Sequence, residues 1–170
     1  MKKLQVLLLS ASLVALTVLT GCPSEDETPE PTAGELQAAR LAGTWTVTEA
    51  TFGGTSRIDT WGTGMTLTFS GASANADMIW NGSYTTSGKS ADEPDADIVW
   101  PSAGTWVFTG ETSVQSFTRN DSPNTVEVTV ASVSDVDATS RELVLRFVLT
   151  DPNGRTEAIY GETWEFRFSQ

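Results

Sequence analysis

The sequence predicts an all-β protein: eight antiparallel strands in an up-and-down barrel, with a short helix before them. Apolar and polar residues alternate with a period of two in most segments after Gly43. Turns rich in Gly, Pro, Asn and Asp separate these segments, and no helical repeat long enough for a crossover joins them. Closure removes exposed sheet edges, so we favour a barrel over the alternative, a two-sheet β-sandwich.

The first predicted element is a helix over 35–41. Thr32 is followed three residues later by Glu35, which is the pattern of a capping box at a helix N-terminus. The period then changes to two over 43–48, where Trp45 and Val47 share one parity and threonines occupy the other. This segment is predicted to be the first half-buried strand.

Seven further strands follow, and the last of them contains an irregularity. Ile159 has the opposite parity to Trp164 and Phe166, so we expect a bulge near 161–162 to keep one apolar face inward. The strands are predicted at 65–69, 78–85, 105–109, 114–119, 126–130, 141–150 and 156–168, with a tight hairpin at 110–111, a longer turn at 120–124 and an Asp-Pro-Asn-Gly turn at 151–154.

The first 22 residues have the organisation of an export signal. A basic start is followed by an apolar stretch over 4–19, which is too short to span a membrane. The stretch ends in Leu19-Thr20-Gly21-Cys22, which resembles the lipobox of bacterial lipoproteins. The resemblance implies cleavage between Gly21 and Cys22, loss of residues 1–21, and attachment to a lipid membrane through an acylated Cys22. The alternative is an ordinary secretory signal, in which the only cysteine of the chain falls at this position by coincidence.

Residues 22–34 are predicted to be an extended linker, and 35–170 a single barrel domain. The linker is acidic and proline-rich and has no large apolar side chain to bury. Its stretch 24–27, Ser-Glu-Asp-Glu, resembles the acidic export tag of Bacteroidota lipoproteins. That resemblance implies an outer-membrane protein facing the cell surface. A solvated acidic tether on a periplasm-facing protein is the alternative.

Charge and residue content exclude several functions. The chain carries 22 acidic and 10 basic residues, for a net charge of -12, so a nucleic-acid partner is not expected. It has no histidine, and its single cysteine is assigned to lipid, which removes Ser-His-Asp and Cys-His catalysis and His-ligated zinc. We therefore expect no enzyme, no cofactor and no metal site, and we interpret the acidic stretch 92–97 as a solvated loop at the barrel rim.

The strand pattern also resembles a known superfamily. A short helix followed by Gly43-Thr44-Trp45 at the start of eight strands resembles the calycins, and specifically the lipocalin-like domains of Bacteroidota lipoproteins; 104–108, 119–121 and 161–166 are similar to that group too. The resemblance implies that Trp45 packs at the closed end of the barrel, beneath an arginine such as Arg167 or Arg119. Closure would pair the first strand with the last, which carries Trp164.

Two functional hypotheses follow for the membrane-anchored barrel; we favour the first, and the second is the alternative. In the first, the barrel binds a small apolar ligand in an interior cavity lined by Trp106, Phe108, Phe69, Leu145 and Phe147. In the second, the barrel is filled by its own side chains and is a non-enzymatic envelope or cell-surface interaction module, whose rim or outer surface contacts a glycan or another protein. The state of the interior distinguishes them. Trp61, Trp80 and Trp100 lie outside the clear alternation, and either a ligand-contacting or a core-covering role is open for each.

Overall fold

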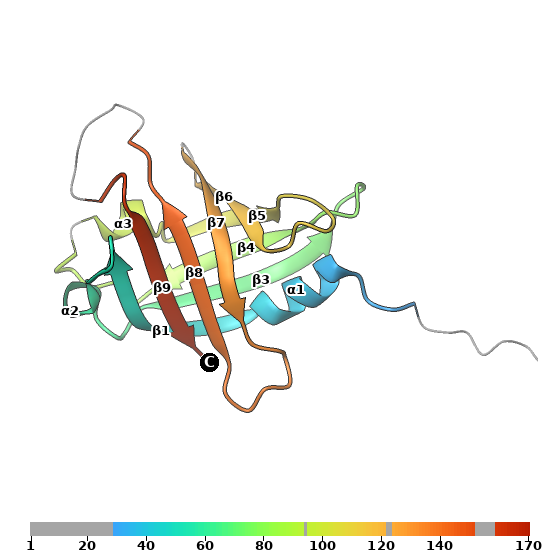
Figure 1. Cartoon of the computed structure of the whole chain (residues 1–170), viewed down its shortest axis with the longest axis horizontal. Helices are drawn as coiled ribbons and strands as arrows, with labels where there is room; N and C mark the ends of the chain where they lie inside the picture. Colours follow the sequence, from blue (N-terminus) through green and yellow to red (C-terminus); the bar gives the residue numbers. More distant parts are fainter. Residues whose placement is uncertain (1–28, 94, 122–123, 152–158) are drawn as a thin grey trace, which may run out of the picture. The chain divides into compact units, whose positions relative to one another are not determined.

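A computed structural model describes residues 29–93, 95–121, 124–151 and 159–170 (Figure 1). The predicted signal (1–21) and most of the predicted linker lie outside these residues. The folded unit is Pro31–Gln170. None of the helices in the described ranges is long and apolar enough to cross a membrane. The elements are α1 (Ala33–Leu41), β1 (Gly43–Phe52), β2 (Thr55–Ser56), α2 (Ile58–Trp61), β3 (Thr66–Ala74), β4 (Trp80–Ser87), α3 (Ala96–Val99), β5 (Ala103–Phe108), β6 (Ser116–Asp121), β7 (Asn124–Val133), β8 (Glu142–Val148) and β9 (Thr163–Ser169).

Eight of the strands form a closed antiparallel barrel with up-and-down order. From β3 to β9 each strand pairs with the next in sequence, and β1 pairs with both β3 and β9. The short β2 pairs only with the end of β1 and extends that strand as a hairpin. This topology confirms the predicted barrel over the two-sheet sandwich.

The seam between β1 and β9 shows how alternation fills the interior. Phe168 lies opposite Val47, Phe166 opposite Ala50 and Trp164 opposite Phe52. The register shifts between Val47 and Glu49, so the even-numbered Ala50 faces inward although the preceding interior positions are odd-numbered. Similar shifts occur in β3 and β7.

Helix α1 lies against one end of the barrel. The hydroxyl of Thr32 accepts a hydrogen bond from the backbone N–H of Glu35 at 3.1 Å, which confirms the predicted N-cap, although the helix begins two residues earlier than expected. Ala38 and Leu41 are buried in the core. At the C-terminus of α1, the carbonyl of Leu41 accepts from the Trp45 indole N–H at 2.7 Å, and the carbonyl of Arg40 accepts from Arg141.

Three details of the connections differ from prediction. The hairpin at 110–111 is wrong, because β5 ends at Phe108 and the connection to β6 spans 109–115. The turn expected over 120–124 is shorter, since Asp121 pairs with Asn124. The bulge expected near 161–162 is also wrong. Strand β9 begins only at Thr163, after a bend in which Gly161 has a φ of +83°. Part of the strand predicted from 156 lies outside the described residues.

Candidate functional site

The candidate site is the barrel interior, where the structure places all five predicted ligand-lining residues. Each has a relative exposure of 3% or less. On β5, Trp106 and Phe108 alternate with Val107, so both rings lie on the inner side of the wall. The five residues thus lie on one shared interior surface, contributed by β3, β5 and β8: Phe69, Trp106, Phe108, Leu145 and Phe147.

Three of these residues form one aromatic cluster. The Trp106 ring centroid lies 5.1 Å from that of Phe108 and 6.2 Å from that of Phe69, both in edge-on geometry. Phe117 from β6 completes the cluster, 5.7 Å from Phe69 and 6.0 Å from Trp106. These distances are in the favourable range for paired rings, so the side chains pack against one another.

Phe147 belongs to a second cluster. Its ring stacks on Phe166 at 5.9 Å and lies edge-on to Trp100 at 5.3 Å. Leu145, which is fully buried, lies opposite Phe166 in the β8–β9 register. The second cluster therefore joins β8 and β9 to a tryptophan that belongs to no strand.

Trp61 and Trp100 belong to the segments of α2 and α3, which lie at the end of the barrel opposite α1 (Figure 1). Trp61 is the last residue of α2, and its ring is 5.0 Å from Phe166 and 5.8 Å from Trp164. Trp100 follows α3 and contacts Tyr84 at 5.9 Å as well as Phe166 at 5.9 Å. Both tryptophans have 0% exposure. The sequence leaves their role open, because neither residue lies in a periodic segment.

An ion pair holds the two tryptophan-bearing segments together. The Glu93 carboxylate accepts hydrogen bonds from Arg57 Nη2 at 3.0 and 3.3 Å, and from the Thr60 hydroxyl at 2.9 Å. Arg57 and Thr60 belong to the α2 region, whereas Glu93 precedes α3. The expectation that the acidic stretch is a wholly solvated loop is wrong at Glu93, whose side chain is only 2% exposed.

Lys89 ties together the segment around α3 at the same end of the barrel. Its ammonium donates to the carboxylate of Asp97, to the carbonyl of Trp100 at 2.7 Å and to the hydroxyl of Ser102 at 3.3 Å. The hydrogen bond from Lys89, followed by its charge, lowers the pKa of Asp97. The contact to the Trp100 carbonyl anchors the backbone that carries this buried ring.

Arg119 lies inside the barrel with 1% exposure. Its guanidinium carbon is 4.6 Å from the Trp100 ring centroid and 5.1 Å from that of Phe147. Nη1 donates to the carbonyl of Val99 at 2.8 Å. The guanidinium thus lies over two interior rings and also donates a hydrogen bond to the helix that precedes Trp100.

The arginine over Trp45 is Arg141, 4.8 Å from the ring centroid, and not Arg119 or Arg167 as the resemblance implied. Arg167 has the opposite parity to Phe166 and Phe168 and lies outside, where it pairs with Glu49 and Glu165. An arginine over Trp45 was the correct expectation, but the arginine named was wrong, because Arg141 lies before β8 and outside any periodic segment.

Trp45 and Trp164 are both fully buried and lie toward opposite ends of β1. Trp45 bonds to the C-terminus of α1, whereas Trp164 donates its indole N–H to the carbonyl of Ile159 at 3.1 Å. The predicted pairing of the first barrel strand with the last is confirmed by the β1–β9 register.

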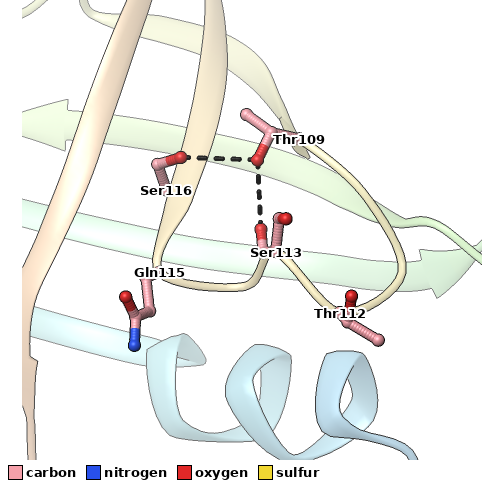
Figure 2. Close-up of a pocket in the computed structure, with 5 residues that line it drawn as sticks. All are labelled: Thr109, Thr112, Ser113, Gln115 and Ser116. Carbon is pink, nitrogen blue, oxygen red and sulfur yellow. Dashed lines mark hydrogen bonds between the residues drawn. The ribbon is translucent and has the colours of Figure 1, made fainter.

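A polar depression of about 420 Å³ lies outside the aromatic interior, beside the 109–115 connection (Figure 2). The Thr109 hydroxyl donates to the carbonyl of Ser113 at 3.1 Å and lies 3.4 Å from the Ser116 hydroxyl. Thr112 and Gln115 complete the lining. Within the described parts of the chain, no group of three or more His, Cys, Asp or Glu side chains could hold a metal ion.

Comparison of the chain with known family models, curated proteins and solved structures finds no match. The lipobox and the lipocalin-like resemblance therefore stay predictions.

Proposed function

We propose that this protein is a lipid-anchored, non-enzymatic module of the cell envelope that acts through its outer surface. The observation that carries the proposal is the packed interior: the residues predicted to line a ligand cavity contact other side chains of the same chain, and Trp61 and Trp100 are buried among them. A barrel filled in this way has its remaining contact surface on the outside.

Energetics favour this form over an apolar-ligand carrier. Removal of one large buried aromatic side chain costs about 3–5 kcal/mol, so displacing both Trp61 and Trp100 would cost roughly 6–10 kcal/mol. A micromolar affinity corresponds to a net binding free energy of about 8 kcal/mol, after all costs of binding. A ligand entering at this end would thus need roughly 6–10 kcal/mol of additional favourable contacts to reach that affinity.

The anchor part of the proposal depends on Cys22. Burial of acyl chains contributes about 0.8 kcal/mol per CH₂ group, and stable attachment needs more than one chain or signal. A modified Cys22 would therefore hold the domain at a membrane surface. We propose the outer membrane as its location, with the acidic residues 24–27 directing it to the cell surface.

Native mass spectrometry of the detergent-extracted full chain tests the filled barrel. We expect no co-purifying small molecule, and no saturable change in tryptophan fluorescence on adding palmitate or retinol. A stoichiometric companion mass, or saturable quenching by either probe, would overturn the proposal and favour a cavity lined by Trp106, Phe108, Phe69, Leu145 and Phe147.

Labelling with a clickable palmitate analogue tests the anchor. We expect label on the wild-type chain and on the control variant Ser24→Ala, and none on Cys22→Ser. Equal labelling of Cys22→Ser would overturn the lipidation proposal. Whole-cell protease digestion tests surface display: replacement of residues 24–27 by neutral residues should protect the domain, and unchanged digestion would contradict the export-tag interpretation.

A further inference from the structure

Three adjacent strands of the barrel carry no charged residue. β3, β4 and β5 lie side by side, and their sequences are TLTFSGASA, WNGSYTTS and AGTWVF (Figure 1). The full chain has 22 acidic and 10 basic residues, so this stretch of wall differs sharply from the average composition. The difference concerns the outer surface, because the interior positions of the strands are mostly apolar.

The outward positions of these strands form rows of short polar side chains. Strand pairing places Thr44, Thr68 and Thr85 in one row, and Ser70, Ser83 and Thr105 in the next. None of these six side chains is buried. We call the outward surface of β3, β4 and β5, with the adjoining ends of β1 and β6, the hydroxyl face: Thr44, Thr46, Thr66, Thr68, Ser70, Ser73, Asn81, Ser83, Thr85, Ser87, Ala103, Thr105, Val107, Thr118 and Asn120.

Hydrogen bonds between strands order several hydroxyls of this face. The Oγ1 atoms of Thr44 and Thr68 are 2.9 Å apart, and the hydroxyls of Thr66 and Ser87 are 2.8 Å apart. The Ser83 hydroxyl also donates to the carbonyl of Ser70 at 3.3 Å. Because these side chains already have defined orientations, a partner would order fewer of them on binding.

The opposite part of the wall is charged. On β8 and β9, Arg146 pairs with Glu165 at 2.5 Å, and Arg167 pairs with Glu165 at 2.8 Å and with Glu49 of β1 at 3.0 Å. The barrel thus has a wall of alternating charges and, separately, a wall of neutral hydroxyls. A charged partner would find complementary groups on the first wall and none on the strands β3, β4 and β5.

We propose that the hydroxyl face binds a neutral, extended β-linked polysaccharide. This inference rests on the proposed function, because it names the partner of the outer surface. Each Ser or Thr hydroxyl both donates and accepts, which matches the hydroxyl groups of a sugar chain. Within a row, residues on neighbouring strands are about 4.8 Å apart, and neighbouring rows are roughly 6.5 Å apart along the strands, so the binding groups repeat regularly. The short side chains form a low-relief surface suited to a flat, extended chain.

The charge of the molecule selects against other partners. A net charge of -12 repels anionic polymers, and the hydroxyl face offers no cation to counter that repulsion. It offers no carboxylate to bind a cationic polymer either. Neutral polyhydroxyl chains are the class for which this surface has donors and acceptors without an electrostatic penalty.

A sedimentation assay tests the proposal with the full chain in detergent. Powdered cellulose and chitin are the neutral probes, and alginate beads are the anionic probe. We expect retention on at least one neutral powder, at least about tenfold stronger than on alginate. Replacing three hydroxyls of one row, in Thr44→Val/Thr68→Val/Thr85→Val, should weaken binding by about tenfold or more, since each lost hydrogen bond weakens binding severalfold.

The matched control removes three hydroxyls outside the hydroxyl face, in Thr51→Val/Thr129→Val/Thr163→Val. It should bind within about twofold of wild type, and tryptophan fluorescence should show that both variants are folded. Valine favours strands as threonine does, so the barrel should form in each. No retention on either neutral powder, equal retention on alginate, or unchanged binding of the row variant would overturn the proposal.

Self-association is a competing outcome. If the hydroxyl face instead covers a second copy of the chain, sedimentation velocity will show a dimer that the row variant abolishes, and that result would overturn the polysaccharide assignment. Failure of the proposed function is distinguishable, because saturable quenching by palmitate or retinol is measured in the same preparation and does not depend on retention by the powders.

Discussion

The substitution Trp100→Ala tests whether side chains of the chain itself fill the barrel. Trp100 has 0% exposure and contacts Tyr84, Phe147 and Phe166, with Arg119 over its ring. Loss of a large buried aromatic residue costs about 3–5 kcal/mol, which includes the cavity that remains. For a domain of this size that corresponds to a fall in the unfolding midpoint of roughly 10–20 °C.

Trp100→Phe is the matched control. It keeps a ring in contact with Phe147 and Phe166, and it removes an indole N–H that has no hydrogen-bond partner among the described residues. Loss of an unpaired buried donor offsets part of the lost packing, so we expect a cost of only about 1–2 kcal/mol. Thermal unfolding by circular dichroism measures both variants.

Indole provides a second measurement on the alanine variant. An apolar cavity of about 150 Å³ in a protein core stays dry and binds small aromatic molecules. Indole should therefore raise the unfolding midpoint of Trp100→Ala in a concentration-dependent way, and leave wild type unchanged. A loss below about 1 kcal/mol in the alanine variant, or equal stabilisation of wild type by indole, would refute the filled-barrel reasoning.

Three further substitutions test other contacts. Burial raises the pKa of Glu165, but the hydrogen bonds from Arg146 and Arg167 outweigh this effect, so the pKa lies below its ordinary 4.5. Glu165→Gln should thus cost about 0.5–1 kcal/mol of unfolding free energy near neutral pH. Urea unfolding should show this difference vanishing as pH falls through the lowered pKa. Arg141→Ala should cost about 1–3 kcal/mol and speed hydrogen exchange in α1, because the guanidinium lies over Trp45 and bonds to the Arg40 carbonyl; unchanged exchange would contradict this role. Gly88→Ala should cost about 3 kcal/mol or more in urea unfolding, since the φ of Gly88 is +67° and a Cβ there would lie 2.1 Å from the Gly64 carbonyl oxygen. Gly161→Ala is the control: Gly161 has a φ of +83° but open space around it, so this change should cost about 1–2 kcal/mol. Similar losses in the two variants would refute the steric argument.

The barrel could be predicted from the sequence because one-sided burial imposes a period of two on each strand. Trp164, Phe166 and Phe168 face inward as their shared parity predicts. Bulges interrupt this alternation, and no residue type in the sequence marks where they occur. Ala50 is buried at even parity, and no residue near it indicates the register shift after Val47.

The burial of the two tryptophans outside the strands could not be predicted. Trp61 and Trp100 follow short helices and have no periodic neighbours, so their burial depends on contacts with distant strands. Glu93 lies in an acidic run that is typical of solvent-exposed loops, and its partner Arg57 is 36 residues earlier. The hydroxyl face could not be predicted either, because the register between strands determines which threonines share a row, and the sequence does not give that register.

The β1–β9 seam has a consequence for the order in which the barrel folds. The pairings from β3 to β9 connect strands that are neighbours in sequence and can form early as hairpins, whereas the closing pairs join Thr46 to Ser169 and Val47 to Phe168. Contacts between distant parts of a chain carry a large loop-closure entropy and slow the folding rate. Until β9 docks, β1 and β8 expose unpaired edges. A chain that is still being synthesised thus cannot close the barrel until β9 is available.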